Sequence, residues 1–132
     1  MNALHPTLGL AAQRRLLGAA LLGVAFASPA QAQPAQRTPV TEIRPLLALA
    51  AEHGAARGVL TGPGADYMRR RFDTSGAIEI DVQALQALPQ PGCARLEVTT
   101  RQRDVLERGT RGDQELRWQI SFCRDGQFPD KR

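Results

Sequence analysis

Two alternating segments near the C-terminus, each flanked by a cysteine, constrain the fold more than any other feature of the chain. In residues 94–101 and 115–122 the even-numbered positions are mostly apolar and the odd-numbered positions mostly polar or charged. This period of two is typical of a strand with one buried face. If Cys93 lies opposite Cys123, paired residue numbers sum to 216, and the apolar positions of both strands share one face. The cysteines and the hydrophobic pattern therefore agree on one antiparallel register.

The same register makes specific cross-strand pairs. Leu96 lies opposite Ile120 on the apolar face, and Arg101 lies opposite Glu115 on the other face, where opposite charges attract. We expect the connecting turn within residues 106–112, where two glycines allow positive φ. The pattern predicts a C-terminal β-hairpin.

The N-terminal segment predicts export. Arg14 and Arg15 precede an apolar run over residues 16–27, and Ala30-Gln31-Ala32 has the pattern of a cleavage site. The run is shorter than the roughly 20 residues of a membrane-spanning helix. We therefore interpret residues 1–32 as a signal peptide that is cleaved near Ala32. The mature chain is expected in the periplasm or outside the cell, without a transmembrane segment.

The two cysteines predict a disulfide. In an exported chain, Cys93 and Cys123 favour a structural bond, which helps to stabilise a domain of only about 100 residues. A redox pair is the alternative, but the spacing is not Cys-x-x-Cys. A metal site would need further ligands, and only His53 and carboxylates are available after the signal peptide. We expect no metal and no cofactor.

In the rest of the chain, prolines, glycines and the spacing of apolar residues predict where segments begin and end. Residues 33–41 carry two prolines without apolar periodicity and predict a flexible leader. An α+β domain is expected over residues 42–126, followed by a polar tail at 127–132. Within the domain, a first helix over residues 45–57 is expected to stop at Gly58.

Further short elements complete the predicted domain. We expect a short strand near residues 59–61, a second helix over 65–72, a half-buried strand over 77–82 and a helical turn over 83–88. The predicted fold class is a small single α+β domain. Its antiparallel sheet has three or four strands, ends in the hairpin and packs against one or two short helices.

The charge composition does not favour nucleic acid as a partner. The whole chain has a net charge of +4, which falls to +2 once Arg14 and Arg15 leave with the signal peptide. The remaining charges of both signs are interspersed, whereas nucleic-acid binding requires clustered positive charge.

The sharpest local charge feature is the run Arg69-Arg70-Arg71, close to an aromatic residue on each side. Tyr67, Arg69, Arg70 and Arg71 are candidate contacts to an acidic partner, to phosphate or to lipid head groups. The alternative is an ordinary helix whose arginines face solvent while Tyr67, Met68 and Phe72 pack inward. Cationic side chains also suit the C-terminal end of a helix.

Enzymatic activity has weaker support in the sequence. His53 is the only histidine of the mature chain, and no nucleophile is close to it in sequence. A small hydrolase would have to use carboxylates, for which Asp66, Asp73, Glu79 and Asp81 are the candidates. We therefore expect no catalytic residues, with a carboxylate hydrolase or a ligand-binding or inhibitor module as the alternatives.

Two segments of the hairpin carry a family resemblance. Gln90-Pro91-Gly92-Cys93-Ala94-Arg95-Leu96 and Ile120-Ser121-Phe122-Cys123-Arg124-Asp125-Gly126 resemble small exported proteins of bacterial integrating conjugative elements. The resemblance implies a setting in the envelope part of a DNA-transfer apparatus (type IV secretion) and assigns no catalytic residue. Together with the expected disulfide, it predicts a non-catalytic accessory domain that binds other envelope proteins.

Overall fold

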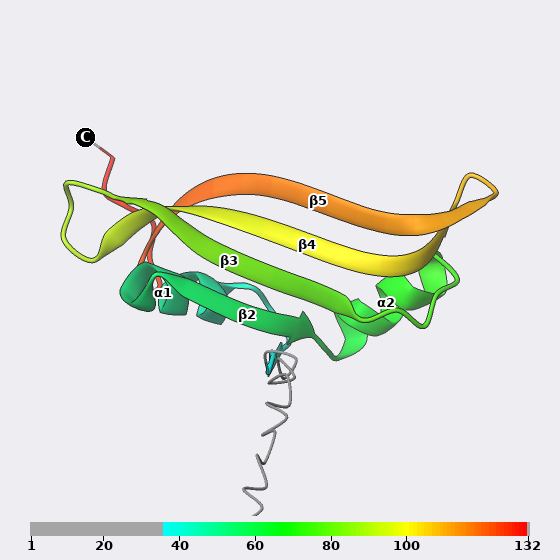
Figure 1. Ribbon diagram of the computed structural model, residues 1–132. Coiled ribbons are helices and arrows are strands. Elements are labelled where there is room, and N and C mark those ends of the chain that lie inside the picture. The colour runs from blue at the N-terminus through cyan, green and yellow to red at the C-terminus, as the bar shows by residue number, and fades with distance from the viewer. Residues whose placement is uncertain (1–35, 132) are drawn as a thin grey trace, which may run out of the picture. The chain divides into compact units, whose positions relative to one another are not determined.

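The computed structural model describes residues 36–131, and the predicted signal peptide over residues 1–32 lies outside this range. The described part contains one five-stranded mixed sheet and two helices (Figure 1). In chain order the elements are β1 (Thr38–Val40), α1 (Arg44–His53), β2 (Ala55–Leu60), α2 (Pro63–Arg71), β3 (Ile78–Ala87), β4 (Cys93–Glu107) and β5 (Thr110–Cys123).

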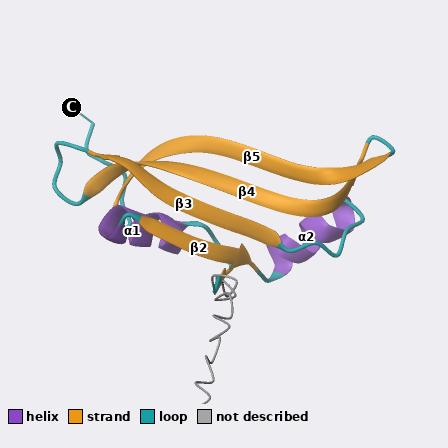
Figure 2. Ribbon diagram, in the orientation of Figure 1, coloured by secondary structure: helices purple, strands orange, loops and turns teal. Residues whose placement is uncertain are grey.

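The strands lie in the sheet in the same order as in the chain. β1 pairs with β2 in parallel through the crossover helix α1, and every later neighbour pair is antiparallel. Both helices lie on the same side of the sheet, α1 under one end and α2 under the other (Figure 2). The predicted α+β single domain is confirmed, but the sheet has five strands where three or four were expected, and it is mixed rather than antiparallel because β1 pairs in parallel with β2.

The predicted hairpin register is confirmed. Cys93 pairs with Cys123, and the pairing keeps the same sum as far as Gln102 opposite Gln114. The turn is formed by Arg108 and Gly109, with φ of 51° and 80°, as a two-residue hairpin loop of this kind requires. A β-bulge after Gln102 places two β4 residues opposite one β5 residue.

The end of the first helix was predicted incorrectly. Helix α1 ends at His53 because Gly54 adopts a left-handed conformation with φ of 91° and donates its N–H to the Ala50 carbonyl. Gly58, expected to stop the helix, instead lies within β2. A Cβ atom on Gly58 would lie 2.5 Å from Leu46 Cδ1, so the glycine allows α1 to pack closely onto the sheet.

Two further expectations need correction. The leader predicted at residues 33–41 includes Thr38–Val40, which form β1 through backbone pairing with residues 58–60 of β2. The helical turn predicted over 83–88 is instead the extension of β3 to Ala87, which pairs with β4 across a bulge near Gln86. In both cases hydrogen bonding to a neighbouring strand outweighs the weak local preference for an irregular leader or a helical turn.

The core lies between α1 and the even-numbered positions of β3, β4 and β5. Helix α1 contributes three fully buried side chains, and Gly58 leaves room for one of them. The core residues are Val40, Leu46, Leu47, Ala50, Ile80, Val82, Ala94, Leu96, Val98 and Phe122. The predicted half-buried alternation of β3 is therefore present in the structure.

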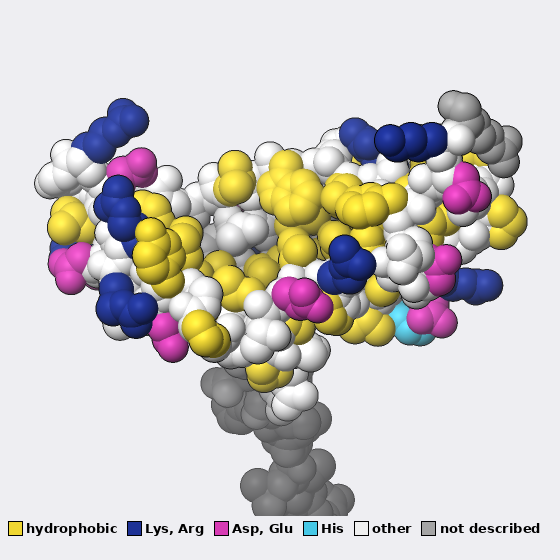
Figure 3. Space-filling view, turned by 180° about the vertical axis from the view of Figure 1, so that it is seen from behind, with side chains coloured by type: hydrophobic (Ala, Val, Ile, Leu, Met, Phe, Trp, Pro, Cys, Tyr) yellow, Lys and Arg dark blue, Asp and Glu magenta, His cyan; other side chains and the backbone are white. Residues whose placement is uncertain are grey.

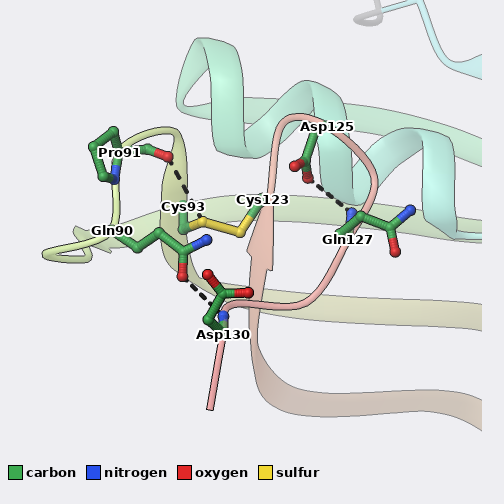
Figure 4. Close-up of a disulfide and its surroundings, with 7 residues drawn as sticks. All are labelled: Gln90, Pro91, Cys93, Cys123, Asp125, Gln127 and Asp130. Atoms are coloured by element: carbon green, nitrogen blue, oxygen red, sulfur yellow. Dashed lines mark hydrogen bonds between the residues drawn. A yellow bond between two sulfur atoms is a disulfide. The ribbon is translucent and has the colours of Figure 1, made fainter. Parts of the chain in front are cut away.

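The C-terminal segment packs against the hairpin rather than ending at residue 126. The Phe128 ring lies edge-on to the Phe122 ring, with centroids 5.3 Å apart. The Cys123 N–H donates to the Gln127 carbonyl at 2.9 Å. The Asp130 N–H donates to Gln90 Oε1 at 2.8 Å, beside the disulfide (Figure 4). The predicted tail at 127–132 is therefore largely part of the folded unit.

The predicted disulfide joins Cys93 to Cys123, and both residues are buried. Such a bond fits a periplasmic or extracellular protein, because reducing compartments disfavour it. Neither helix within residues 36–131 is long and apolar enough to cross a membrane.

Replacing both cysteines with serine should lower the free energy of unfolding by about 3 to 4 kcal/mol, because the bond constrains the unfolded chain. The two residues are separated by 30 positions in the chain. Urea titration of the oxidised protein and the double variant measures the difference. A loss well below 1 kcal/mol would contradict a stabilising role for the bond.

Candidate functional site

The face of the sheet that carries the two helices is apolar and only partly covered. Figure 3 views this side and shows hydrophobic side chains across its middle, where the surface is hollowed. Trp118 and Ile120 are half-buried against the α1 core, and Leu116 farther along β5 is 63% exposed. The uncovered apolar surface therefore extends from the α1 core toward α2.

A groove of about 290 Å³ lies where α2 meets this face. Met68 and Phe72 line it from α2, and Leu116 lines it from β5. The buried side chains of Ile78 and Val105 also line it. We call these five residues, Met68, Phe72, Ile78, Val105 and Leu116, the apolar groove.

Helix α2 is attached mainly through its C-terminal end. It fully buries only Ala65, whereas α1 buries three side chains. The Leu106 N–H donates to the Phe72 carbonyl at 2.9 Å, and Thr74 Oγ1 donates to the Arg103 carbonyl at 2.8 Å. These bonds hold the end of α2 beside the β4 bulge. The helix therefore borders the groove without filling it.

The opposite face of the sheet is charged and centres on Asp81 in β3. Arg37, immediately before β1, donates to Asp81 Oδ1 at 2.8 Å, and Arg101 of β4 donates to Oδ2 at 2.5 Å. Arg101 also donates to Glu115 at 2.8 Å, which confirms the predicted cross-strand pair. Arg117 extends this charged network through Glu115.

The network keeps Asp81 ionised. Partial burial by itself raises the pKa of this carboxyl group, but hydrogen bonds and charge from Arg37 and Arg101 outweigh it. The net effect is a pKa below the ordinary value for aspartate. A general acid at neutral pH needs the opposite shift. Asp81 is therefore suited to joining three segments of the sheet rather than to donating a proton.

The other carboxylates proposed for a hydrolase are also paired with arginines. Asp66 pairs with Arg69, Asp73 with Arg111 and Glu79 with Arg37. His53 is exposed at the end of α1, and its ring contacts the neighbouring Glu52. No cluster of three or more potential metal-ligating side chains is present within residues 36–131.

The arginine run lies in the last turn of α2, as predicted. Tyr67 is 59% exposed, so the expectation that it packs inward was wrong. Arg71 lies over the Phe72 ring, 5.7 Å from its centroid, while Arg69 is engaged with Asp66. Of the candidate partner contacts, Tyr67, Arg70 and Arg71 are exposed on the surface of α2.

Sequence reasoning missed both the groove and Arg37. Arg37 was assigned to the leader, although it contacts Asp81 at a separation of 44 residues. The groove residues Met68, Val105 and Leu116 come from three elements and share no period along the chain. The strand alternation around Leu116 gave one signal, and the interpretation of residues 65–72 as a helix that packs Met68 inward gave another.

Comparison of the chain with protein-family models, with curated proteins and with solved structures found no match.

Replacing Asp81 with asparagine should destabilise the protein at neutral pH by about 1 kcal/mol, because two partly buried arginines lose a charged acceptor. Since the folded-state pKa is lowered, the stabilisation is present above the unfolded-state value of about 4 and is lost as pH falls through and below it. The difference in free energy of unfolding between wild type and Asp81→Asn should therefore become smaller below about pH 4.

Urea titrations across this pH range measure this difference. Glu79→Gln serves as a control with a smaller expected effect, because Glu79 has a single contact with Arg37 at 3.5 Å. An equal loss in both variants, or a difference that does not change with pH, would contradict a central role for Asp81.

Proposed function

We propose that this protein is an exported, non-catalytic accessory domain of the bacterial cell envelope that binds another envelope protein through the apolar groove. The observation that carries the proposal is the groove itself, formed by Met68, Phe72, Ile78, Val105 and Leu116. Exposed apolar surface next to a depression is typical of protein-binding sites.

The size and lining of the groove favour a protein partner. Its volume of about 290 Å³ lies just below the range of roughly 300 to 1,000 Å³ for small-molecule pockets. It suits one or two apolar side chains of a partner chain. Met68 on the weakly anchored helix α2 adds adaptability, because an unbranched thioether adjusts to different shapes.

The charged residues near the groove suit a partner surface with an apolar centre and a polar rim. Glu107 and Glu115 line the groove with the apolar side chains. Arg70 and Arg71 are exposed on α2, the helix that borders the groove. Rim charges of this kind contribute to orientation and association rate more than to affinity.

The proposed setting combines three observations. The disulfide fits an oxidising compartment. Residues 1–32 have the pattern of a signal peptide with cleavage near Ala32, which accounts for delivery to the periplasm. The resemblance of the segments around Cys93 and Cys123 supports a role in a conjugative transfer system.

A photo-crosslinking side chain at Met68 should form a discrete adduct with one envelope protein in the native cell, because Met68 lines the groove. The same probe at Tyr67 is the matched control, since Tyr67 is the preceding residue of α2 and does not line the groove. Denaturing electrophoresis and mass spectrometry identify the adducts. Equal adducts from both positions, or none from Met68, would argue against the groove.

The conjugative setting predicts a cellular phenotype. Deletion of the gene should lower the transfer frequency of the element that carries it, and the wild-type chain should restore it. Met68→Glu should fail to restore transfer, because a buried charge at an interface centre weakens binding about tenfold or more. Tyr67→Glu should restore it. Normal transfer without the gene would contradict this setting.

A further inference from the structure

Among the described residues 36–131, strand β5 forms one edge of the sheet and has no neighbour on its outer side. It is 14 residues long, and positions 110–117 are exposed. An unpaired edge of this length presents a row of free backbone donors and acceptors, to which another strand can add.

The direction of the free backbone groups follows from the end of the strand. The Cys123 N–H points away from β4 and donates to the Gln127 carbonyl, whereas the Arg124 N–H donates to the Gly92 carbonyl on the β4 side. Backbone groups alternate along a strand, so odd-numbered residues of β5 point outward. The bulge lies in β4, and β5 therefore keeps this alternation as far as Arg111.

Edge protection differs between the two sides of the sheet. The β1 edge is only three residues long and contains Pro39, which lacks an N–H. The β5 edge contains no proline, and its even-numbered residues, on the apolar face, carry no charge. Of the two edges, β5 alone is open to pairing over a long stretch.

The pattern of β5 fits an antiparallel copy of itself. The odd-numbered residues carry the outward backbone groups, so an odd-numbered residue of one copy must pair with an odd-numbered residue of the other. The two paired numbers then have an even sum, and the two-fold axis passes through a residue rather than between two residues. The free edge runs from the turn at Arg108-Gly109 to Ser121, where the C-terminal segment covers the strand end at Cys123. The centre of residues 111–121 is position 116.

The charges of Glu115 and Arg117 also favour an axis at position 116. With Leu116 opposite Leu116 of the second copy, Glu115 lies opposite Arg117 in both directions, and opposite charges in this position attract. A centre at 115 would place two glutamates opposite each other, and a centre at 117 would place two arginines there. A centre at 118 would use only residues 115–121, because the C-terminal segment blocks longer pairing.

We propose that β5 pairs antiparallel with β5 of a second copy of this chain about a two-fold axis at Leu116, which joins the two five-stranded sheets into one continuous sheet. Glu115 and Arg117 of the two copies form two symmetric ion pairs. This pairing goes beyond the proposed function and needs no envelope partner. It uses the backbone edge of β5 beside the apolar groove, whose lining includes Glu115 and Leu116.

Two single variants test the pairing through charge. Glu115→Arg creates facing arginines, and Arg117→Glu creates facing glutamates, so each variant alone should self-associate about tenfold or more weakly than wild type. When the two variants are mixed, positions 115 and 117 are both arginine in one chain and both glutamate in the other. The mixture should therefore form a heterodimer.

Analytical ultracentrifugation of the oxidised, signal-free protein measures these states, with circular dichroism to establish that each variant is folded. A wild-type dimer, two weakened variants and a restored mixture would support the proposal. A monomeric wild type, or a mixture no more associated than its components, would overturn it.

A cysteine at the axis tests the register. In Leu116→Cys the two new residues form a non-hydrogen-bonded antiparallel pair, the type of position that Cys93 and Cys123 occupy. This variant should give an intermolecular disulfide on oxidation, seen by non-reducing mass measurement. In Gln114→Cys the new residues would lie about 14 Å apart, too far to react. Cross-linking of Gln114→Cys but not Leu116→Cys would overturn the register.

The two proposals fail separately. If Arg117→Glu is monomeric yet a Met68 probe still reacts with its envelope partner, the edge and the groove act independently, as expected here. If the protein with the Met68 probe and no other change dimerises but forms no adduct with an envelope protein, only the proposed role of the groove is contradicted. A wild-type monomer that retains the adduct contradicts only the edge pairing.

Discussion

The pairing of β4 with β5 in the register set by Cys93 and Cys123 divides the molecule into two chemically different faces. Between the bulges, even-numbered residues of β3, β4 and β5 lie on the face that carries the helices, and odd-numbered residues lie on the face with the charged network. A shift by one residue would expose the apolar set and bury the charges. The disulfide excludes such a shift at one end, and the β-bulge after Gln102 accommodates the one-residue difference between this register and that of the two-residue turn.

The two faces have different consequences. On the charged face, Asp81 connects the segment before β1 with β3 and β4 through arginines, and the arrangement stabilises the sheet rather than performing chemistry. On the apolar face, α1 covers one end closely because Gly58 has no side chain, while α2 leaves a groove at the other end. The features suited to recognition therefore lie on the apolar face and along the β5 edge.

The hairpin could be predicted because its signals are local: a period of two, two cysteines and a turn with glycines. The end of α1 could not, because the alanine-rich sequence before Gly58 is compatible with both helix and strand. Packing of Leu46 against Gly58 decides between them. Strand β1 was missed because its three residues include Pro39 and pair with a strand about 20 positions later. The groove depends on Met68, Val105 and Leu116 lining one depression, although they come from three separate elements of the chain.

Strand β1 has a further consequence for the order of assembly. The β4–β5 hairpin closes over two residues, whereas β1 reaches β2 only after the crossover helix α1 is in place. Contacts over short loops form faster than contacts over long ones. We therefore expect β1 to join last, so that an intermediate could already hold its sulfur bridge while Asp81 still lacked Arg37. Such an intermediate would expose β2 as a second sheet edge. Pairing of β1 with β2 would cover that edge and complete folding.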